Sequence, residues 1–454
     1  MAKDIARALA EFAVAMKLPD IPPETIEFTK GLALKTVAGM LVGSSMPVGR
    51  RVIRGTIERG HASEVGAIGC GITTSLWNAV LNNGIFAHAA ELEDDSFLRG
   101  TAWDITSFPV YFPLAEKLKL SGRELLEICI IGLEVHSRTT LFYPQGHLGL
   151  TVIPGALGPS VGVARAFKLS MDETMAAMGL ALSGVPVAYV SFGTDAHYFE
   201  TALHSLQALI AAELAKCGLA GNPDIVTYMS NLVGKERVIP EKIIQDLGTQ
   251  WRVHDIWVKK YPCCFHMHRH LDGLKDIITA ENISLSQVDR VRVHISHLEE
   301  ICNRPEPASI GDLQFSFQNS IASMLLDRDV NYDHINEKKL TDPVFKEARS
   351  KVQIVNHEEW HPEYAMETPA RIELILKDGR EFSRERQFAV GAPQEPISIE
   401  QFRSLFIKFV NGILQESRRS WTADAIMNLE NLDVRDLKEL NRILVYETVE
   451  GPGQ

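Results

Sequence analysis

Residues 371–386 read RIELILKDGREFSRER, and this stretch decides the class of the fold. Two β-forming runs flank Asp378-Gly379, a dipeptide that is typical of the tight turn between antiparallel strands. Upstream, DRVRVHIS at 289–296 alternates between apolar and polar residues, which is the period of a strand with one buried face. The second half of the chain is therefore predicted to contain a sheet.

The segments on both sides of this predicted sheet favour helices instead. Apolar residues recur at helical spacing through roughly the first 255 positions. Ser121-Gly-Arg-Glu and Ser170-Met-Asp-Glu each match the capping box that begins many helices. Helical spacing returns near Ile399 and continues to the end of the sequence. Helices are therefore expected at both ends of the chain.

The length of the chain indicates more than one domain. A chain of 454 residues is too long for a single hydrophobic core, so two domains are expected. We predict an α+β fold with a large all-α helical domain formed by both chain ends, residues 1–255 and 396–454. A smaller α/β lid domain, residues 256–395, is inserted in it.

Composition and charge exclude several classes of protein. The formal net charge is −12 with no basic run, so no nucleic-acid partner is expected. No uncharged apolar stretch of roughly 18 residues predicts a membrane span, and the N-terminal segment reads as an amphipathic helix rather than a signal peptide. Six cysteines without a CxxC pair favour reduced, mostly buried thiols. We expect a cytoplasmic protein.

The first candidate site is the acidic segment HAAELEDDS at 88–96. In a helix, His88, Glu91 and Asp95 would lie near one face. Crowded carboxylates raise one another's pKa, which suits a general acid or base. The alternative, which spacing alone favours, is a solvated acidic turn.

The second candidate site is WVKKYPCCFHMHRH at 257–270. In a strand, His266, His268 and His270 would share one face and could bind zinc with Cys263 or Cys264. The same segment could instead form a cationic site for an anion, or serve the fold alone. The further cations of such a site would be Lys259, Lys260 and Arg269.

Two weaker candidates complete the set. FGTDAHYFE at 192–200 contains His197 and leads into a predicted helix, whose first backbone N–H groups attract carboxylates. An ordinary helix-capping turn explains this pattern equally well. His147 stands alone in the loop segment YPQGH, and such a histidine is more often exposed than catalytic.

These segments, in this order, resemble the MmgE/PrpD family. HAAELEDD at 88–95 is similar to the family's HAxDxDD segment, with Glu for the first two Asp. FGT at 192–194, KKYPCC at 259–264 and GAPQEPIS at 391–398 match further landmarks, so the likeness spans roughly residues 5–410. The family includes 2-methylcitrate dehydratase, cis-aconitate decarboxylase and iminodisuccinate epimerase.

The resemblance implies a fold and a type of chemistry. The family has a helical domain and a smaller α/β lid, is usually dimeric, and places its active site between the two domains. Its reactions remove a proton beside a carboxylate without a redox cofactor. The resemblance thus implies a small anionic carboxylic-acid substrate, a homodimer, and no cofactor or metal.

The sequence departs from the pattern of the family's dehydratases and decarboxylases at four positions. Those members have Thr at Asp95, a catalytic His at Ala102, Lys at His197 and Tyr at Asn319. Loss of the acid at Ala102 makes departure of hydroxide harder. An epimerase needs no leaving group, only two groups that exchange a proton on opposite faces of one carbon.

The leading hypothesis is therefore a cofactor-independent epimerase of an amino-dicarboxylate such as iminodisuccinate. Its expected catalytic residues are Lys259, His268, His197, Glu91 and Asp95, and its expected substrate-binding residues are Arg269, His147, Asn319 and Lys260. The alternatives are a hydro-lyase or decarboxylase of a tricarboxylic acid, a zinc-dependent hydrolase that uses Cys263, His266, His268 and His270, and a catalytically inactive binding protein.

Overall fold

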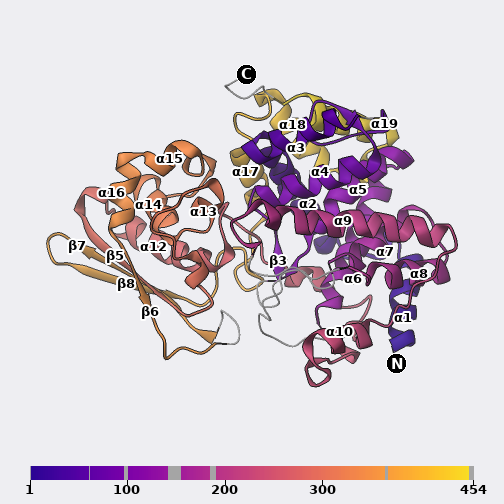
Figure 1. Cartoon of the computed structure of the whole chain (residues 1–454), viewed down its shortest axis with the longest axis horizontal. Helices are drawn as coiled ribbons and strands as arrows, with labels where there is room; N and C mark the ends of the chain where they lie inside the picture. The colour runs from indigo at the N-terminus through magenta and orange to yellow at the C-terminus, as the bar shows by residue number, and fades with distance from the viewer. Residues whose placement is uncertain are drawn as a thin grey trace.

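The computed structural model describes residues 2–60, 62–96, 101–141, 155–184, 191–362 and 367–448. Its elements gather in two lobes, with the large sheet and its helices on one side and most helices on the other (Figure 1). Helices dominate and strands are few, so the predicted α+β class is confirmed.

The helical lobe takes elements from both parts of the chain that were predicted to be helical. From the first part come α1 (Ala2–Ala15), α2 (Pro23–Ser45), α3 (Pro47–Glu58), α4 (Leu76–Ala89), α5 (Asp104–Leu118), α6 (Gly122–Thr139), α7 (Leu157–Ala166), α8 (Met171–Ala181), α9 (Asp195–Lys216), α10 (Ile225–Val233) and α11 (Glu241–Ile244). From the last part come α17 (Ile399–Phe409), α18 (Glu416–Met427) and α19 (Val434–Tyr446). Short strand pairs join them, β1 (Val65–Gly66) with β2 (Thr73–Thr74) and β3 (Asp95–Ser96) with β4 (Thr101–Ala102).

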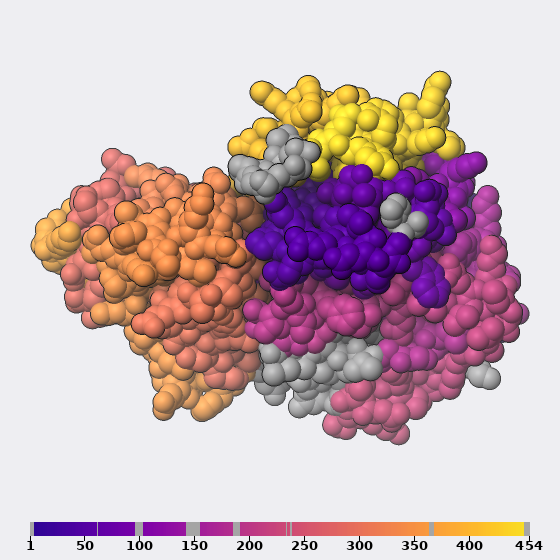
Figure 2. Space-filling model, turned by 45° about the horizontal axis from the view of Figure 1, so that its top comes forward, coloured from indigo at the N-terminus to yellow at the C-terminus, as the bar shows by residue number. Residues whose placement is uncertain are grey.

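Local sequence signals explain where several of these helices begin and how the chain ends meet. Ser121 and Ser170 form the predicted capping boxes, in which the carboxylates of Glu124 and Glu173 accept hydrogen bonds from the backbone N–H groups of the two serines. α17 packs on α2, and the C-terminal residues (yellow) lie beside the N-terminal ones (indigo) on the surface (Figure 2). The approach is so close that a Cβ on Gly31 would lie 2.6 Å from the ring of Phe402.

The sheet lobe contains α12 (His268–Ala280), α13 (Ile310–Gln314), α14 (Phe317–Asp327), α15 (Glu337–Thr341) and α16 (Pro343–Ser350). Its strands are β5 (Val288–Ile295), β6 (Val352–Asn356), β7 (Ala370–Leu376) and β8 (Glu381–Arg386), in the order β6-β5-β7-β8. β5 and β6 are parallel, and the other pairs are antiparallel. The predicted β7–β8 hairpin is confirmed, and its turn needs Gly379 because φ there is 89°.

Each lobe has its own main apolar core. One joins residues from Ile5 to Val258 with residues from Ile397 to Leu444, and the other runs from Tyr261 to Leu376. These two cores support the proposed division into an outer helical domain and an inserted lid. Among the described residues no single helix is long and apolar enough to cross a membrane, and only the bent pair α2–α3, with an angle of 76°, meets that test of length and composition.

Candidate active site

The acidic segment after α4 folds into an inward-facing turn. α4 ends at Ala89, and Glu91 takes a left-handed backbone conformation with a φ of 52°. Asp95 then lies in β3, where it exchanges backbone hydrogen bonds of 2.8 and 3.2 Å with Trp257. The helix that was predicted to carry His88, Glu91 and Asp95 on one face is therefore wrong beyond Ala89, because the chain turns there.

Lys259 lies at the centre of this turn. Its Nζ is 2.8 Å from Glu91 Oε1 and 2.5 Å from Glu93 Oε1, and its backbone N–H donates to Asp94 Oδ1 at 2.8 Å. Glu91, Glu93 and Asp94 are all buried, so the solvated acidic turn that spacing alone favoured is also wrong. The structure thus brings together two segments that lie more than 160 positions apart in the sequence.

A second buried cation, Lys35 of α2, was missed by the sequence analysis. Its Nζ lies 2.5 Å from Asp94 Oδ1 and donates to the carbonyl of Leu92 at 2.5 Å. A signal for it exists, because Lys30 and Lys35 interrupt the long apolar run of α2. A lysine that faces the core of such a helix needs a buried acidic partner.

Two histidines pack against each other, with their rings tilted by 55°, beside Glu91. The ring centroids of His88, from α4, and His197, from α9, are 4.0 Å apart, and His197 also packs on Phe192 at 4.4 Å. His88 Nδ1 is 2.7 Å from the hydroxyl of Thr201. Gly193, with a φ of 80°, turns the chain into α9 as the FGT motif predicted, and this turn places His197 in the first turn of the helix.

Burial sets the protonation of these groups. It raises the pKa of Glu91 to about 8, with the charge on Glu93 adding to the shift and Lys259 opposing it. Burial also raises the pKa of Asp95 well above its ordinary value, and burial with the nearby Lys259 lowers the pKa of His88 to about 3. Burial likewise lowers the pKa of His197. We call His88, Glu91, Glu93, Asp95, His197 and Lys259 the cluster. At neutral pH it therefore offers protonated carboxyls, on Glu91 and Asp95, beside neutral imidazoles.

Lys259 keeps its charge in this buried place. Burial alone would lower the pKa of its ammonium, but Glu91 and Glu93 hold that pKa well above its ordinary value. Several polar atoms in the cluster or next to it have no hydrogen-bond partner within the described parts of the chain: Glu91 Oε2, Asp95 Oδ1, His197 Nδ1 and His268 Nδ1. Such atoms are available to a small polar molecule.

The strand that was expected to align three histidines is wrong. Phe265–Met267 is a short 3-10 turn and α12 begins at His268, so the alternating residues point in different directions. His268 Nε2 is 3.2 Å from the carbonyl of Cys263, and His270 Nε2 is 2.9 Å from the carbonyl of His294. Burial and the charge of Lys259 lower the pKa of His268, which stands beside the cluster.

A different set of residues has the chemistry of a metal site. Within the described ranges, His88, Glu91 and His197 form the one group of histidine, cysteine and acidic residues whose ligand atoms all lie within 4.8 Å of one another. Two imidazoles and a carboxylate suit a divalent transition metal. Lys259 already supplies positive charge to Glu91 at this place. The zinc set predicted around Cys263 is not among such groups.

Three of the four expected substrate-binding residues have hydrogen-bond or ion-pair partners outside the cluster. Arg269 is buried and donates to Glu299 Oε1 at 3.1 Å and to the carbonyl of Thr368 at 3.0 Å. Asn319 is buried between the carbonyl of His334 and the guanidinium of Arg349, with both contacts at 3.3 Å. Lys260 pairs with Asp272 at 2.5 Å, and His147 falls outside the described residues. The structure therefore gives Arg269, Asn319 and Lys260 partners other than the cluster.

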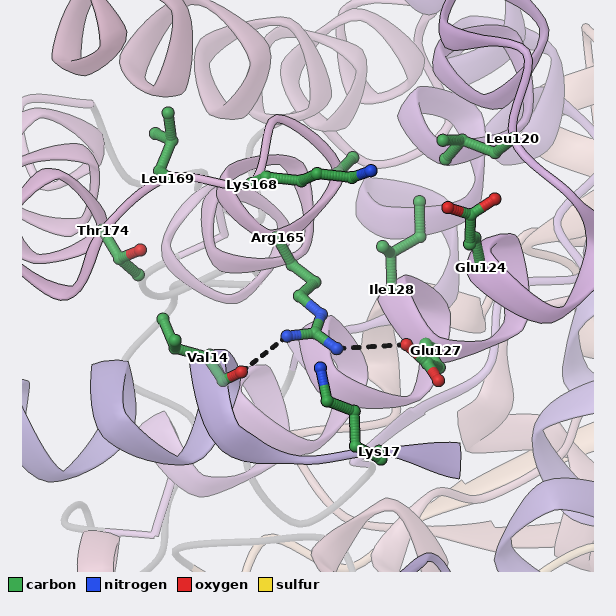
Figure 3. A pocket seen from close by; sticks show the side chains of 12 residues that line it. Val14, Lys17, Leu120, Glu124, Glu127, Ile128, Arg165, Lys168, Leu169 and Thr174 are labelled. Atoms are coloured by element: carbon green, nitrogen blue, oxygen red, sulfur yellow. Dashed lines mark hydrogen bonds and ion pairs between the residues drawn. The ribbon is translucent and has the colours of Figure 1, made fainter. Parts of the chain in front are cut away.

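Two surface cavities border the helical lobe. A cavity of about 470 Å³ lies where α9 begins, lined by Gly193, Asp195 and Tyr198 from that side and by Ile310 from the sheet lobe. Another, of about 350 Å³, lies between α1, α6 and α7, where Arg165 donates to the carbonyl of Val14 and pairs with Glu127 (Figure 3). Neither cavity is lined by an expected site residue, although Asp195 and Tyr198 of the first are close to His197 in sequence.

The chain is similar to known proteins over most of its length. The model of the MmgE/PrpD N-terminal domain matches residues 7–232, and that of the MmgE/PrpD C-terminal domain matches residues 261–431. Cis-aconitate decarboxylase of Aspergillus terreus is 22% identical, over 96% of this chain and 95% of the relative. A cis-aconitate decarboxylase-like protein, oryM, of Aspergillus oryzae is 21% identical, over 96% and 97% of the two chains.

Proposed function

Since the chain belongs to the MmgE/PrpD family, we propose that it is a lyase that works without a cofactor on a small polycarboxylic acid. The proposed chemistry is proton transfer at a carbon next to a carboxylate. One observation carries the proposal: the buried Lys259 ammonium lies 2.8 Å from Glu91 and 2.5 Å from Glu93. Beside it are two neutral histidines, His88 and His197, and carboxyls that keep their protons at neutral pH.

The cluster can bind and stabilise an anion despite its many acids. When Glu91 is protonated, it no longer offsets the charge of Lys259, so part of that charge is available to a substrate carboxylate. A charge that develops on carbon in the reaction would lie in a water-poor place, where a fixed cation stabilises it strongly.

Decarboxylation illustrates the proposed step. The bond between the substrate carbon and one carboxylate breaks, carbon dioxide leaves, and the electron pair stays on the substrate, where a neighbouring double bond and carboxylate spread it. Glu91 then donates its proton to carbon and becomes a carboxylate beside Lys259. An unsaturated tricarboxylate such as cis-aconitate, the acid in the names of two relatives, meets these requirements.

Epimerisation is the second candidate, and the residues around the turn favour it. Ala102 stands where the family's dehydratases and decarboxylases have a catalytic histidine, and it pairs with Asp95 between β3 and β4. A neutral base such as His197 and an acid such as Glu91 could remove and return a proton on opposite faces of one carbon. This reaction needs no leaving group.

One experiment separates the two candidates. The protein is incubated in deuterated water with cis-aconitate, 2-methylcitrate and amino-dicarboxylates, and proton NMR follows each acid. Loss of carbon dioxide or water, with deuterium on the product carbon where a proton is returned, supports the lyase. Inversion with deuterium and no lost group supports the epimerase instead. If no acid reacts or exchanges, both proposals fail, and Lys259→Met controls for a contaminating activity.

A further inference from the structure

Four successive backbone carbonyls at the turn after α4 each accept a hydrogen bond from a side chain. The carbonyl of Ala89 accepts from Gln314 Nε2 at 2.9 Å, and that of Ala90 accepts from the hydroxyl of Tyr332 at 2.7 Å. The next two carbonyls, of residues 91 and 92, accept from the ammonium groups of Lys259 at 3.3 Å and Lys35 at 2.5 Å. All four donors come from distant parts of the sequence.

The turn needs such partners. The last carbonyls of a helix receive no hydrogen bond from an N–H group of the same helix, so buried ones must find donors elsewhere. Glu91 adds a second demand, because its left-handed backbone conformation is unfavourable for a residue with a side chain. The surrounding donors therefore hold both the end of α4 and the direction of the Glu91 side chain.

Two of the four donors belong to the sheet lobe. Gln314 is the last residue of α13, and Tyr332 follows α14. Gln314 also accepts from the hydroxyl of Tyr198 at 3.1 Å, and its backbone carbonyl accepts from the N–H of Cys264 at 3.0 Å. This one residue thus contacts all three segments that carry the cluster: the end of α4, the start of α9 and the segment that begins at Lys259.

We propose that Gln314 and Tyr332 are positioning residues through which the sheet lobe fixes the Glu91 carboxyl in its reactive place. The inference rests on the proposed function, because it concerns the acid of that reaction. When both donors are in contact, the turn is held and Glu91 stays buried beside Lys259. When the contacts are lost, the carbonyls of Ala89 and Ala90 need water, and the turn and its carboxyl become solvated.

The test uses variants that remove one donor each and keep its volume. Tyr332→Phe removes only a hydroxyl, and Gln314→Met removes the amide. The chain offers matched controls, because Tyr111 also donates to a backbone carbonyl, that of Pro159 at 3.3 Å. Gln207 does so as well, to the carbonyl of Ala181 at 3.0 Å. Tyr111→Phe and Gln207→Met therefore lose the same kind of bond away from the turn.

Two readouts are measured on every variant. The first is kcat and KM with the substrate that the wild-type protein turns over. The second is the protonation of Glu91 in the resting protein, followed by infrared spectroscopy of its carboxyl band during a pH titration, with Glu91→Gln identifying the band. The second readout needs no turnover, so it decides the inference even if the proposed reaction is not found.

We expect both test variants to lower kcat about two- to tenfold, the effect of one hydrogen bond, with KM nearly unchanged. The Glu91 titration should move to lower pH, because a solvated carboxyl loses its proton more easily. Both control variants should keep the wild-type kcat and titration. Test variants with a wild-type Glu91 titration would overturn the inference, whether or not activity falls, and Gln314→Met alone decides if Tyr332→Phe does not fold.

Discussion

Replacement of Lys259 by methionine is the strongest perturbation of the cluster. The change keeps the length of the side chain and removes its charge. Lys259 Nζ lies 2.8 Å from Glu91 Oε1 and 2.5 Å from Glu93 Oε1, and the three side chains are 1%, 2% and 8% exposed. Removal of one partner from a buried ion pair lowers the free energy of unfolding by about 3–5 kcal/mol. We expect a loss of this size at alkaline pH.

The loss should depend on pH in a defined direction. Without Lys259, the folded-state pKa of Glu91 is raised further above its value in the unfolded chain, because the opposing charge is gone. A raised carboxyl pKa destabilises the folded state above the unfolded pKa, and this penalty reaches its full size above the folded pKa. Each carboxyl that takes up a proton should recover about 1.4 kcal/mol per pH unit on acidification.

Urea unfolding followed by circular dichroism at alkaline and mildly acidic pH measures this effect. Lys117→Met is the matched control, because Lys117 pairs with Glu64 at 3.0 Å on the surface, with side chains 43% and 37% exposed. That pair should contribute at most about 1 kcal/mol. Turnover in Lys259→Met should fall by at least about 100-fold. A destabilisation as small as that of the control, or one that does not change with pH, would refute the role of Lys259 as the buried counter-ion of Glu91 and Glu93.

Four further predictions concern the acid, the metal, the expected clamp and the assembly. Activity that needs the Glu91 proton should be present below about pH 8 and fall as pH rises through that value. Glu91→Gln should lose most of its turnover, and its residual kcat should no longer fall near pH 8. Elemental analysis should find no stoichiometric metal, and dialysis against a chelator should leave activity intact. A metal requirement would instead implicate His88, Glu91 and His197 as metal ligands. Arg269→Met should lower the free energy of unfolding by about 3–5 kcal/mol at unchanged KM, because Arg269 pairs with Glu299 inside the sheet lobe, and a large rise in KM would restore its role as a substrate clamp. Light scattering should find a homodimer, and Phe199→Asp should dissociate it if the exposed apolar residues of α9 form the contact; a monomeric wild-type protein would contradict this.

Local signals in the sequence predicted much of the fold because they act over a few residues. The capping boxes at Ser121 and Ser170 and the turn at Gly379 each satisfy backbone groups nearby, so they work wherever the segment lies. The alternation of His266, His268 and His270 misled for a related reason. A short period-two run fits a strand, but the structure starts a helix within it.

The site was only partly predictable because its decisive contacts join distant segments. Glu91 and Lys259 were both chosen as candidates, but nothing near either residue shows that they form an ion pair. The partners of the buried acidic segment are also remote: Lys35 pairs with Asp94, and Gln314 donates to the carbonyl of Ala89 at a separation of 225 positions. Spacing within the acidic segment favoured a solvated turn because those partners lie outside it.

The packing of α17–α19 on α2 has a consequence for synthesis on the ribosome. Lys30 of α2 donates to the carbonyl of Met427 at 2.8 Å, a partner that is translated 397 positions later. The core from Tyr261 to Leu376 draws on one continuous stretch, so it can close while the final helices are still inside the exit tunnel. The larger core cannot close until those helices emerge, and its apolar faces remain open to chaperones for most of translation.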